Sequence, residues 1–181
     1  AADSPARRAC GDILRAFPAG GGALVDSSPM YGSSEAVIGA ELARAPSKGL
    51  FAATKVWTVG SLPGRRQMDS SRALWGVARF DLMQVHNLLD WRAHWPLLQE
   101  MKAAGRVRYI GMTTSHGRRH DDLEELLRRE RLDFVQLTYN LNDRQVEERL
   151  LAAAAERSAA GNEKRPMDRG DQFGQKRRKR L

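Results

Sequence analysis

Two kinds of sequence pattern alternate along most of this chain, and the alternation restricts the folds that it can adopt. Amphipathic stretches with apolar residues three or four positions apart predict helices, and short apolar runs between them predict strands. The predicted strands are residues 23–25, 50–57, 81–86, 107–112 and 134–137. Strands that alternate with helices form parallel sheets covered by helices. The sequence therefore predicts an α/β fold, either an open doubly wound sheet or a segment of a barrel.

Six helices are expected around these strands, although the apolar spacing of the third is irregular. We place Cys10 in the core of the first helix and assign Glu35 to favourable electrostatics at the start of the second. His94, His116 and His120 are expected to face solvent. The expected helices cover residues 5–17, 34–42, 65–79, 91–104 and 122–127, and the last runs from Asn142 or Asp143 through Leu151.

Polar side chains stand at or just beyond the carboxyl end of each predicted strand. They are Asp26, Lys55, His86, Thr113 and Gln136. In barrel enzymes the reactive groups come from the carboxyl ends of several successive strands. This placement favours a barrel segment over an open sheet.

Four residues of this chain form a set suited to reducing a carbonyl: Asp26, Tyr31, Lys55 and His86. A tyrosine hydroxyl has an ordinary pKa of about 10, too high for efficient proton donation near neutral pH. A nearby lysine ammonium lowers that pKa, and a carboxylate keeps a buried lysine charged. A neutral histidine can hydrogen-bond the carbonyl oxygen and orient it. The set therefore suits delivery of a proton to the oxygen while a hydride reaches the carbon.

Several other classes of protein lack support in the sequence. It has no Gly-x-Ser-x-Gly motif, no metal-ligand spacing and no glycine-rich phosphate loop. Cys10 is the single cysteine, which excludes intramolecular disulfides. No apolar run approaches the roughly 20 residues that a membrane-spanning helix needs. We expect a cytoplasmic protein, while an export signal upstream of residue 1 stays open.

The formal net charge of +8 is concentrated near the carboxyl end. Residues 163–181 contain eight Lys or Arg and three Asp or Glu residues, a net charge of +5. Low hydrophobicity and a block of like charge predict disorder. We therefore divide the chain into a barrel domain, residues 1–160, and a basic, disordered tail without strands, residues 161–181.

Five segments in order resemble the aldo-keto reductase family. Residues 26–35, Asp-Ser-Ser-Pro-Met-Tyr-Gly-Ser-Ser-Glu, are similar to its signature Asp-Thr-Ala-x-x-Tyr-Gly-x-Ser-Glu. The other segments are Ala-Thr-Lys-Val at 53–56, Asp-Leu-Met-Gln-Val-His-Asn at 81–87, Gly-Arg-Val-Arg-Tyr-Ile-Gly at 105–111 and Asp-Phe-Val-Gln-Leu-Thr-Tyr-Asn at 133–140. The resemblance implies a partial (β/α)8 TIM barrel of about five strands, with the first strand and the last two absent.

The resemblance also implies the activity and the roles of the four residues. It implies NADPH-dependent reduction of aldehydes or ketones, with NADH as the other possible cofactor. Tyr31 would donate the proton, Asp26 and Lys55 would adjust its acidity, and His86 would orient the carbonyl substrate.

Further residues are assigned to cofactor and substrate by the same resemblance. Gln136 would contact the nicotinamide amide, and Asp26 would also lie at the cofactor. Thr113 and Thr114 stand where the family has Ser-Asn, so Thr113 keeps the hydroxyl but Thr114 lacks the amide. Trp57 and Trp91 would line the substrate pocket.

Three alternatives remain open at this stage. The chain could be a non-catalytic relative or a binding subunit, or its tail could bind nucleic acid non-specifically. Lys55 could instead form a Schiff base in a lyase. Because an incomplete barrel exposes sheet edges, we also expect self-association.

Overall fold

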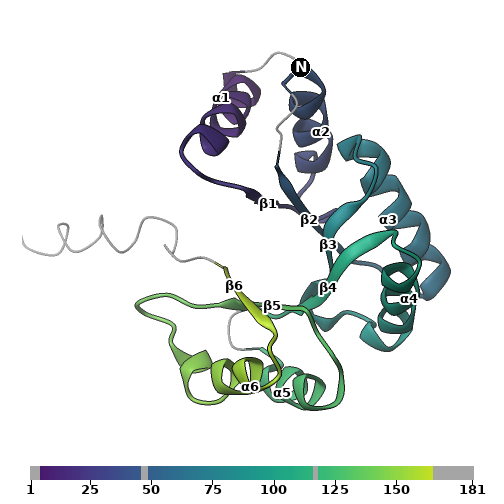
Figure 1. Cartoon of the computed structure of the whole chain (residues 1–181), viewed down its shortest axis with the longest axis vertical. Helices are drawn as coiled ribbons and strands as arrows, with labels where there is room; N and C mark the ends of the chain where they lie inside the picture. The colour runs from purple at the N-terminus through teal and green to yellow at the C-terminus, as the bar shows by residue number, and fades with distance from the viewer. Residues whose placement is uncertain (1–4, 46–48, 116–117, 165–181) are drawn as a thin grey trace, which may run out of the picture. The chain divides into compact units, whose positions relative to one another are not determined.

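A computed structural model describes residues 5–45, 49–115 and 118–164, and the structural statements below concern these residues. They form alternating helices and strands (Figure 1). The helices are α1 (Pro5–Ala19), α2 (Ser34–Arg44), α3 (Ser61–Trp75), α4 (Trp91–Ala103), α5 (His120–Arg129) and α6 (Leu150–Glu156), with short 3-10 helices η1 (His86–Leu88) and η2 (Gln145–Glu147). The strands are β1 (Leu24–Asp26), β2 (Phe51–Val56), β3 (Phe80–Val85), β4 (Val107–Thr113), β5 (Phe134–Thr138) and β6 (Ala160–Lys164).

The chain divides into two compact units, with the boundary between Ile110 and Gly111 inside β4. In the first unit, β1 pairs with β2 and β2 with β3, both in parallel. Helix α3 packs against β2 and α4 against β3 (Figure 1). In the second unit, β4 pairs with β5 and β5 with β6, again in parallel, while α5 packs on α6. Each unit is thus a run of parallel strands joined by helices, as the sequence predicts.

Buried apolar residues hold each unit together. Strand β2 is buried at every position except its first, which is typical of a parallel strand covered on both faces. Around β2 and β3 the largest fully buried apolar side chains include Trp75 and Met68 of α3, Trp95 of α4 and Leu82 of β3. In the second unit Leu123 and Leu127 of α5 are likewise fully buried.

Helix α3 and the last helix differ most from the ranges that the sequence predicts. Helix α3 covers 61–75 rather than 65–79, because Gly76 adopts a left-handed conformation and ends the helix, with its N–H donated to the Ala73 carbonyl at 3.2 Å. The last helix begins at Leu150, because the Asn140 side chain accepts hydrogen bonds from the backbone N–H groups of Asn142 and Asp143, both at 2.9 Å. This Asx turn removes the two residues from a helix start.

A sixth strand, β6, corrects the prediction that no strand follows residue 160. It pairs with β5 from Phe134↔Ala160 to Thr138↔Lys164. The Ala160 N–H also donates to the Asp133 carbonyl at 2.8 Å. This strand forms through main-chain hydrogen bonds to β5, and its polar side chains give no apolar signal. The remainder of the predicted tail, residues 165–181, lies outside the described residues.

Helix α1 also differs from expectation, because Cys10 is exposed rather than in a core. Ile13 and Phe17, on the same predicted stripe, are 65% and 38% exposed. The helix meets α2 at Gly11, where an added Cβ would lie 2.5 Å from the Glu41 carboxylate. The close approach at this glycine turns the apolar stripe of α1 away from α2.

Candidate active site

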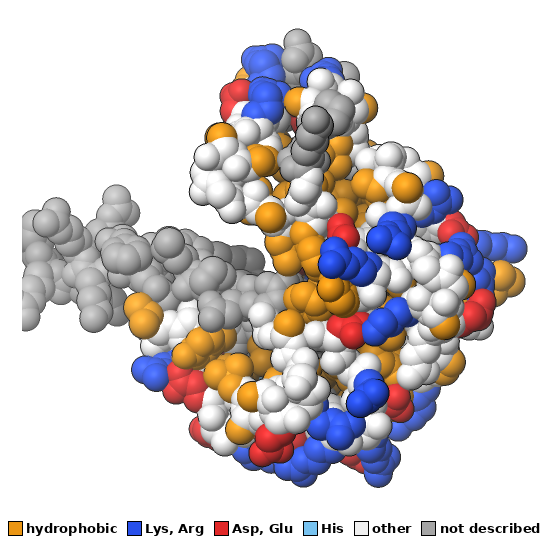
Figure 2. All heavy atoms as spheres, in the orientation of Figure 1, with side chains coloured by type: hydrophobic (Ala, Val, Ile, Leu, Met, Phe, Trp, Pro, Cys, Tyr) orange, Lys and Arg blue, Asp and Glu red, His pale blue; other side chains and the backbone are white. Residues whose placement is uncertain are grey.

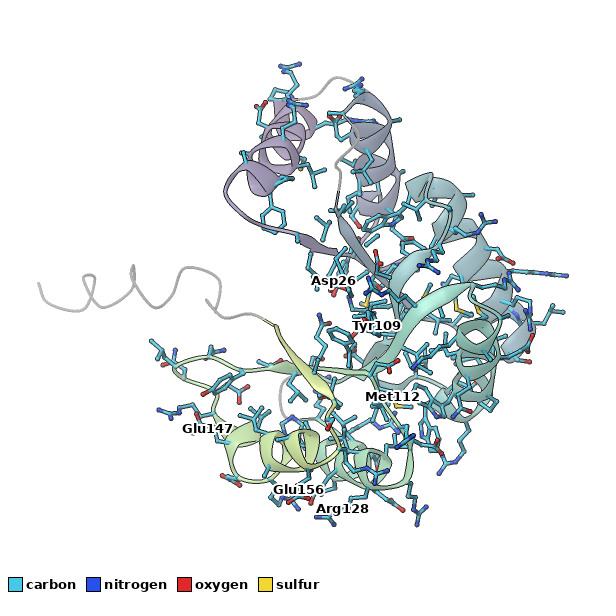
Figure 3. All side chains as sticks on the ribbon, viewed as in Figure 1. Asp26, Tyr109, Met112, Arg128, Glu147 and Glu156 are labelled. Atoms are coloured by element: carbon cyan, nitrogen blue, oxygen red, sulfur yellow. The ribbon has the colours of Figure 1, made fainter. Side chains whose placement is uncertain are left out.

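The four residues predicted to act on a carbonyl lie together in the first unit. Asp26, labelled in Figure 3, is the last residue of β1, Lys55 is near the end of β2, and His86 follows β3 directly. The Lys55 Nζ lies 2.5 Å from Asp26 Oδ2 and 5.5 Å from the centre of the Tyr31 ring. The Tyr31 and His86 rings meet edge to face, with centroids 5.8 Å apart. Parallel pairing of β1, β2 and β3 brings their carboxyl ends, and therefore these groups, to one edge.

Lys55 is fully buried and therefore needs compensation for its charge. Its ammonium donates to Asp26 Oδ2 at 2.5 Å and to the Ser27 carbonyl at 2.8 Å. Burial lowers the pKa of Lys55, while the carboxylates of Asp26 and, more weakly, Glu35 oppose that decrease. The site therefore places the Lys55 ammonium, whose pKa is lowered, next to the Tyr31 ring.

Gln84 is part of this arrangement, and the sequence analysis missed it. It is the register partner of Lys55 on β3, and its Nε2 lies 3.4 Å from Asp26 Oδ1. The two oxygens of Asp26 therefore face different partners, which fixes the plane of the carboxylate. Gln84 lies two residues before His86, and this spacing along a strand is the signal that could have identified it.

A second missed residue, Ser28, orients both the histidine and the tyrosine. Its Oγ lies 2.9 Å from Nδ1 of the buried His86. Its carbonyl accepts the Tyr31 N–H at 2.9 Å. One residue thus sets the direction of the imidazole and begins the turn that carries the phenol.

Tyr31 itself lies on a tight connection between β1 and α2 and is 41% exposed. Gly32 follows it with a φ of +60°, and no atom lies within 4 Å of where its Cβ would be. The Ser34 N–H donates to the Tyr31 carbonyl at 3.2 Å, and the Ser34 Oγ lies 2.6 Å from the Ser27 Oγ. The turn is thus tied at both ends while the ring stays open to solvent.

Glu35 has more contacts than the helix-start role assigned from the sequence. It is in the first turn of α2 but is 4% exposed. Its carboxylate accepts hydrogen bonds from Thr54 Oγ1 at 2.6 Å, Ser71 Oγ at 2.9 Å and Trp75 Nε1 at 3.2 Å. A buried carboxylate with three neutral donors links α2, β2 and α3 directly behind Lys55.

His94 corrects a prediction, because it is fully buried rather than exposed to solvent. Its Nε2 donates to the Thr58 carbonyl at 2.8 Å, and Asp90 accepts the Gly60 N–H at 2.7 Å. His94 of α4 and Asp90, directly before α4, thus hold the loop that follows β2. His116 lies outside the described residues, and His120 is half-buried.

The two tryptophans assigned to substrate lie on this loop and at the start of α4. Trp57 is 41% exposed, and Gln67 binds both its backbone N–H and its carbonyl, at 2.6 and 3.1 Å. Trp91 is the first residue of α4, and the Arg92 guanidinium lies 4.7 Å from its ring centre. Their contact with substrate stays a prediction.

Three of the four residues assigned to the cofactor are in the second unit, whereas Asp26 is in the first. Thr113, at the end of β4, is the register partner of Gln136 on β5, and the Thr114 N–H donates to the Gln136 carbonyl at 3.0 Å. All three residues are buried. In the part of the chain that the structure describes, the buried Thr114 Oγ1 has no hydrogen-bond partner.

Among residues 5–45, 49–115 and 118–164, no group of histidine, cysteine and carboxylate side chains is placed to hold a metal ion. Over the same ranges no helix has the length and apolarity to cross a membrane.

Parallel strands joined by helices, with polar side chains at their carboxyl ends, define the class of protein as an α/β protein of barrel type. The family follows from sequence comparison. The profile of the Aldo/keto reductase family matches residues 3–161, and the chain belongs to this family.

Individual relatives agree with this assignment. The chain is 24% identical over 196 residues to an NADH-specific methylglyoxal reductase of Escherichia coli (strain K12), covering 91% of this chain and 58% of that protein. It also resembles the structure of an aldo-keto reductase from Bacillus halodurans, with 21% identity and a TM-score of 0.77, over 91% of this chain and 58% of the other. The glycerol dehydrogenase of Gluconobacter oxydans gives 23% identity, a TM-score of 0.74, and coverage of 89% and 54%.

These likenesses confirm the predicted fold as a partial (β/α)8 barrel. The described residues contain six strands rather than the predicted five or so. The chain spans about 58% of the length of the curated relative that it matches.

Proposed function

We propose that this chain reduces aldehydes or ketones to alcohols with a reduced nicotinamide nucleotide, and that Tyr31 donates the proton. The observation that carries the proposal is the buried Lys55–Asp26 pair, whose ammonium lies 5.5 Å from the centre of the Tyr31 ring. A positive charge at this distance favours the phenolate and so eases proton release. Family membership supports oxidoreductase chemistry in general.

The residues of the chain divide the work on the substrate. The Tyr31 hydroxyl delivers its proton to the carbonyl oxygen, and its solvent exposure allows a proton to return from water afterwards. His86, oriented by Ser28, donates a hydrogen bond to the same oxygen and positions the carbonyl. Asp26 keeps Lys55 charged throughout.

A bound reduced nicotinamide would supply the hydride to the carbonyl carbon. Thr113, Thr114 and Gln136 suit its carboxamide, because the Gln136 amide offers both a donor and an acceptor. The orphaned Thr114 Oγ1 supports a ligand there, since buried polar atoms are seldom left without a partner. We propose NADPH and retain NADH as a candidate, because the curated relative is named as NADH-specific.

Fluorescence titration of this chain with NADPH and with NADH tests binding, and loss of absorbance at 340 nm with methylglyoxal tests turnover. We expect binding of at least one nucleotide in the micromolar range and a measurable rate. Lys55→Met should lower kcat by about 10²-fold or more, in the range of general acid catalysis. If neither nucleotide binds at millimolar concentration, the enzyme proposal fails and the non-catalytic alternative gains support.

A further inference from the structure

A cavity of about 300 Å³ lies in the first unit, at the amino-terminal ends of β3 and β4. Phe80 and Val107, the first residues of these strands, line it together with residues of α3. His86 lies just beyond the other end of β3. Six strand residues separate the two ends by about 17 Å, at roughly 3.3 Å per residue. The cavity is therefore separate from the candidate active site.

The inner wall of the cavity is apolar. Met68 from α3, Met83 from β3 and Met101 from α4 line it with Phe80 and Val107. All five side chains are at least 94% buried. Methionine side chains are unbranched and polarizable, so they adapt to flat or irregular apolar groups.

Three arginines also line the cavity. Arg72 lies one turn after Met68 on α3, Arg79 directly precedes β3, and Arg106 directly precedes β4. Arg106 is paired with Asp69 at 3.0 Å. Within the described ranges, the side chains of Arg72 and Arg79 have neither an ion-pair nor a hydrogen-bond partner. Figure 2 shows basic side chains beside hydrophobic ones over α3 and the neighbouring strands.

Ordinary surface roles explain only part of this arrangement. Arg72 is in the last turn of α3, where a cation interacts favourably with the helix dipole. That role does not account for Arg79, which lies outside a helix, or for the apolar wall beneath both groups. Three arginines and one aspartate leave the lining with a net charge of +2.

We propose that this cavity binds a small organic anion that has one carboxylate on an aryl or short acyl body. The unpaired guanidiniums of Arg72 and Arg79 bind the carboxylate, since arginine donates two parallel hydrogen bonds to such a group. The methionine wall takes the apolar body. The volume is at the lower end of the range for small-molecule pockets, about 300–1,000 Å³, which limits the ligand to a compact one.

The methionines provide a local probe of binding, because three of the six in the sequence line the cavity. The full chain labelled with ¹³C-methyl methionine is titrated with 2-naphthoate, with 2-naphthalenemethanol and with acetate. We expect saturable shifts of the Met68, Met83 and Met101 methyl signals with naphthoate, and at least tenfold weaker binding of the other two compounds. Unmoved methyl signals at 10 mM naphthoate, or equal binding of the neutral alcohol or of acetate, overturn the proposal.

Charge-matched variants locate the anion. Arg72→Gln and Arg79→Gln should each weaken naphthoate binding about tenfold, as expected for loss of one charge-assisted contact. Arg66→Gln removes an exposed arginine of α3 that does not line the cavity, and it should leave the affinity unchanged. An equal loss in Arg66→Gln, with the methyl spectrum of the free protein intact, overturns the assignment. Neither the titration nor the variants depend on nicotinamide binding.

Discussion

Replacement of Asp26 by asparagine isolates the buried charge pair on which the reductase proposal rests. In the native chain the Lys55 side chain is fully buried and Asp26 is 19% exposed. Asp26→Asn keeps the size and one acceptor oxygen but removes the negative charge. The variant therefore leaves a buried ammonium without its carboxylate partner, while its hydrogen bond to the Ser27 carbonyl at 2.8 Å is retained.

The folding free energy that Asp26→Asn loses has an estimated lower and upper limit. Removing one partner of a buried ion pair costs about 3–5 kcal/mol of folding free energy. Lys55 can limit this loss by releasing its proton on folding. From an ordinary pKa of 10.5, neutralisation costs about 4.8 kcal/mol at pH 7 and about 2 kcal/mol at pH 9. We expect a loss of about 3–4.5 kcal/mol at pH 7 and at most about 2 kcal/mol at pH 9.

The direction of the pH dependence follows from proton binding. Burial lowers the pKa of Lys55 in the folded chain, and loss of Asp26 lowers it further. Between the folded and unfolded pKa values the unfolded chain binds more protons, so stability rises with pH. The pH range between these two pKa values of Lys55 is wider in the variant. The difference between variant and native chain must therefore shrink from pH 7 to pH 9.

Urea unfolding followed by tryptophan fluorescence measures this difference, because Trp57, Trp75, Trp91 and Trp95 are all in the first unit. Asp81→Asn is the matched control. Asp81 is 22% exposed and faces Arg108 at 3.7 Å, but Arg108 is 52% exposed and stays hydrated without it.

The control should lose about 1 kcal/mol, equally at both pH values. A loss below 1 kcal/mol in Asp26→Asn, or one that does not change with pH, would refute the reasoning about a buried, partner-dependent ammonium.

Three further predictions concern the surroundings of the site and the sheet. Glu35→Gln should move the alkaline limb of the pH profile of kcat/KM to lower pH, because Lys55 loses a nearby negative charge. Glu41 is about equally buried on α2, so Glu41→Gln serves as the control. It should lower the melting temperature without moving the alkaline limb. Gly39→Ala should lower the free energy of unfolding in urea by about 3 kcal/mol or more, because the added Cβ would lie 1.8 Å from the Leu74 carbonyl oxygen. Gly161→Ala has open space around the added Cβ, so it should change that free energy by less than about 0.5 kcal/mol. Size-exclusion chromatography with light scattering should show concentration-dependent association, because among the described residues β1 and β6 each pair with a single strand. A compact monomer at every concentration contradicts this.

The placement of the reactive side chains could be predicted from the sequence because it needs only local information. Asp26, Lys55 and His86 each end or follow a strand, and parallel pairing brings such ends together without knowledge of the register. Tyr31 could be added because its spacing from Asp26 matches the family signature.

The supporting contacts could not be predicted, because they depend on register and packing. Gln84 reaches Asp26 because it pairs with Lys55 across β2 and β3. The donors to Glu35 include Ser71 and Trp75, which are 36 and 40 residues away in sequence. Strand β6 forms from main-chain hydrogen bonds to β5, which leave no pattern of apolar side chains.

The central claim is that Tyr31 gives its proton to the substrate, and Tyr31→Phe tests it most directly. The variant removes one hydroxyl and keeps the ring beside His86. In single-turnover reduction of an aldehyde by bound NADPH or NADH, we expect the rate to fall by about 10²–10⁴-fold while nucleotide affinity stays the same. A variant that reduces the aldehyde as fast as the native chain would show that the proton comes from another group, and the account of this site would be wrong.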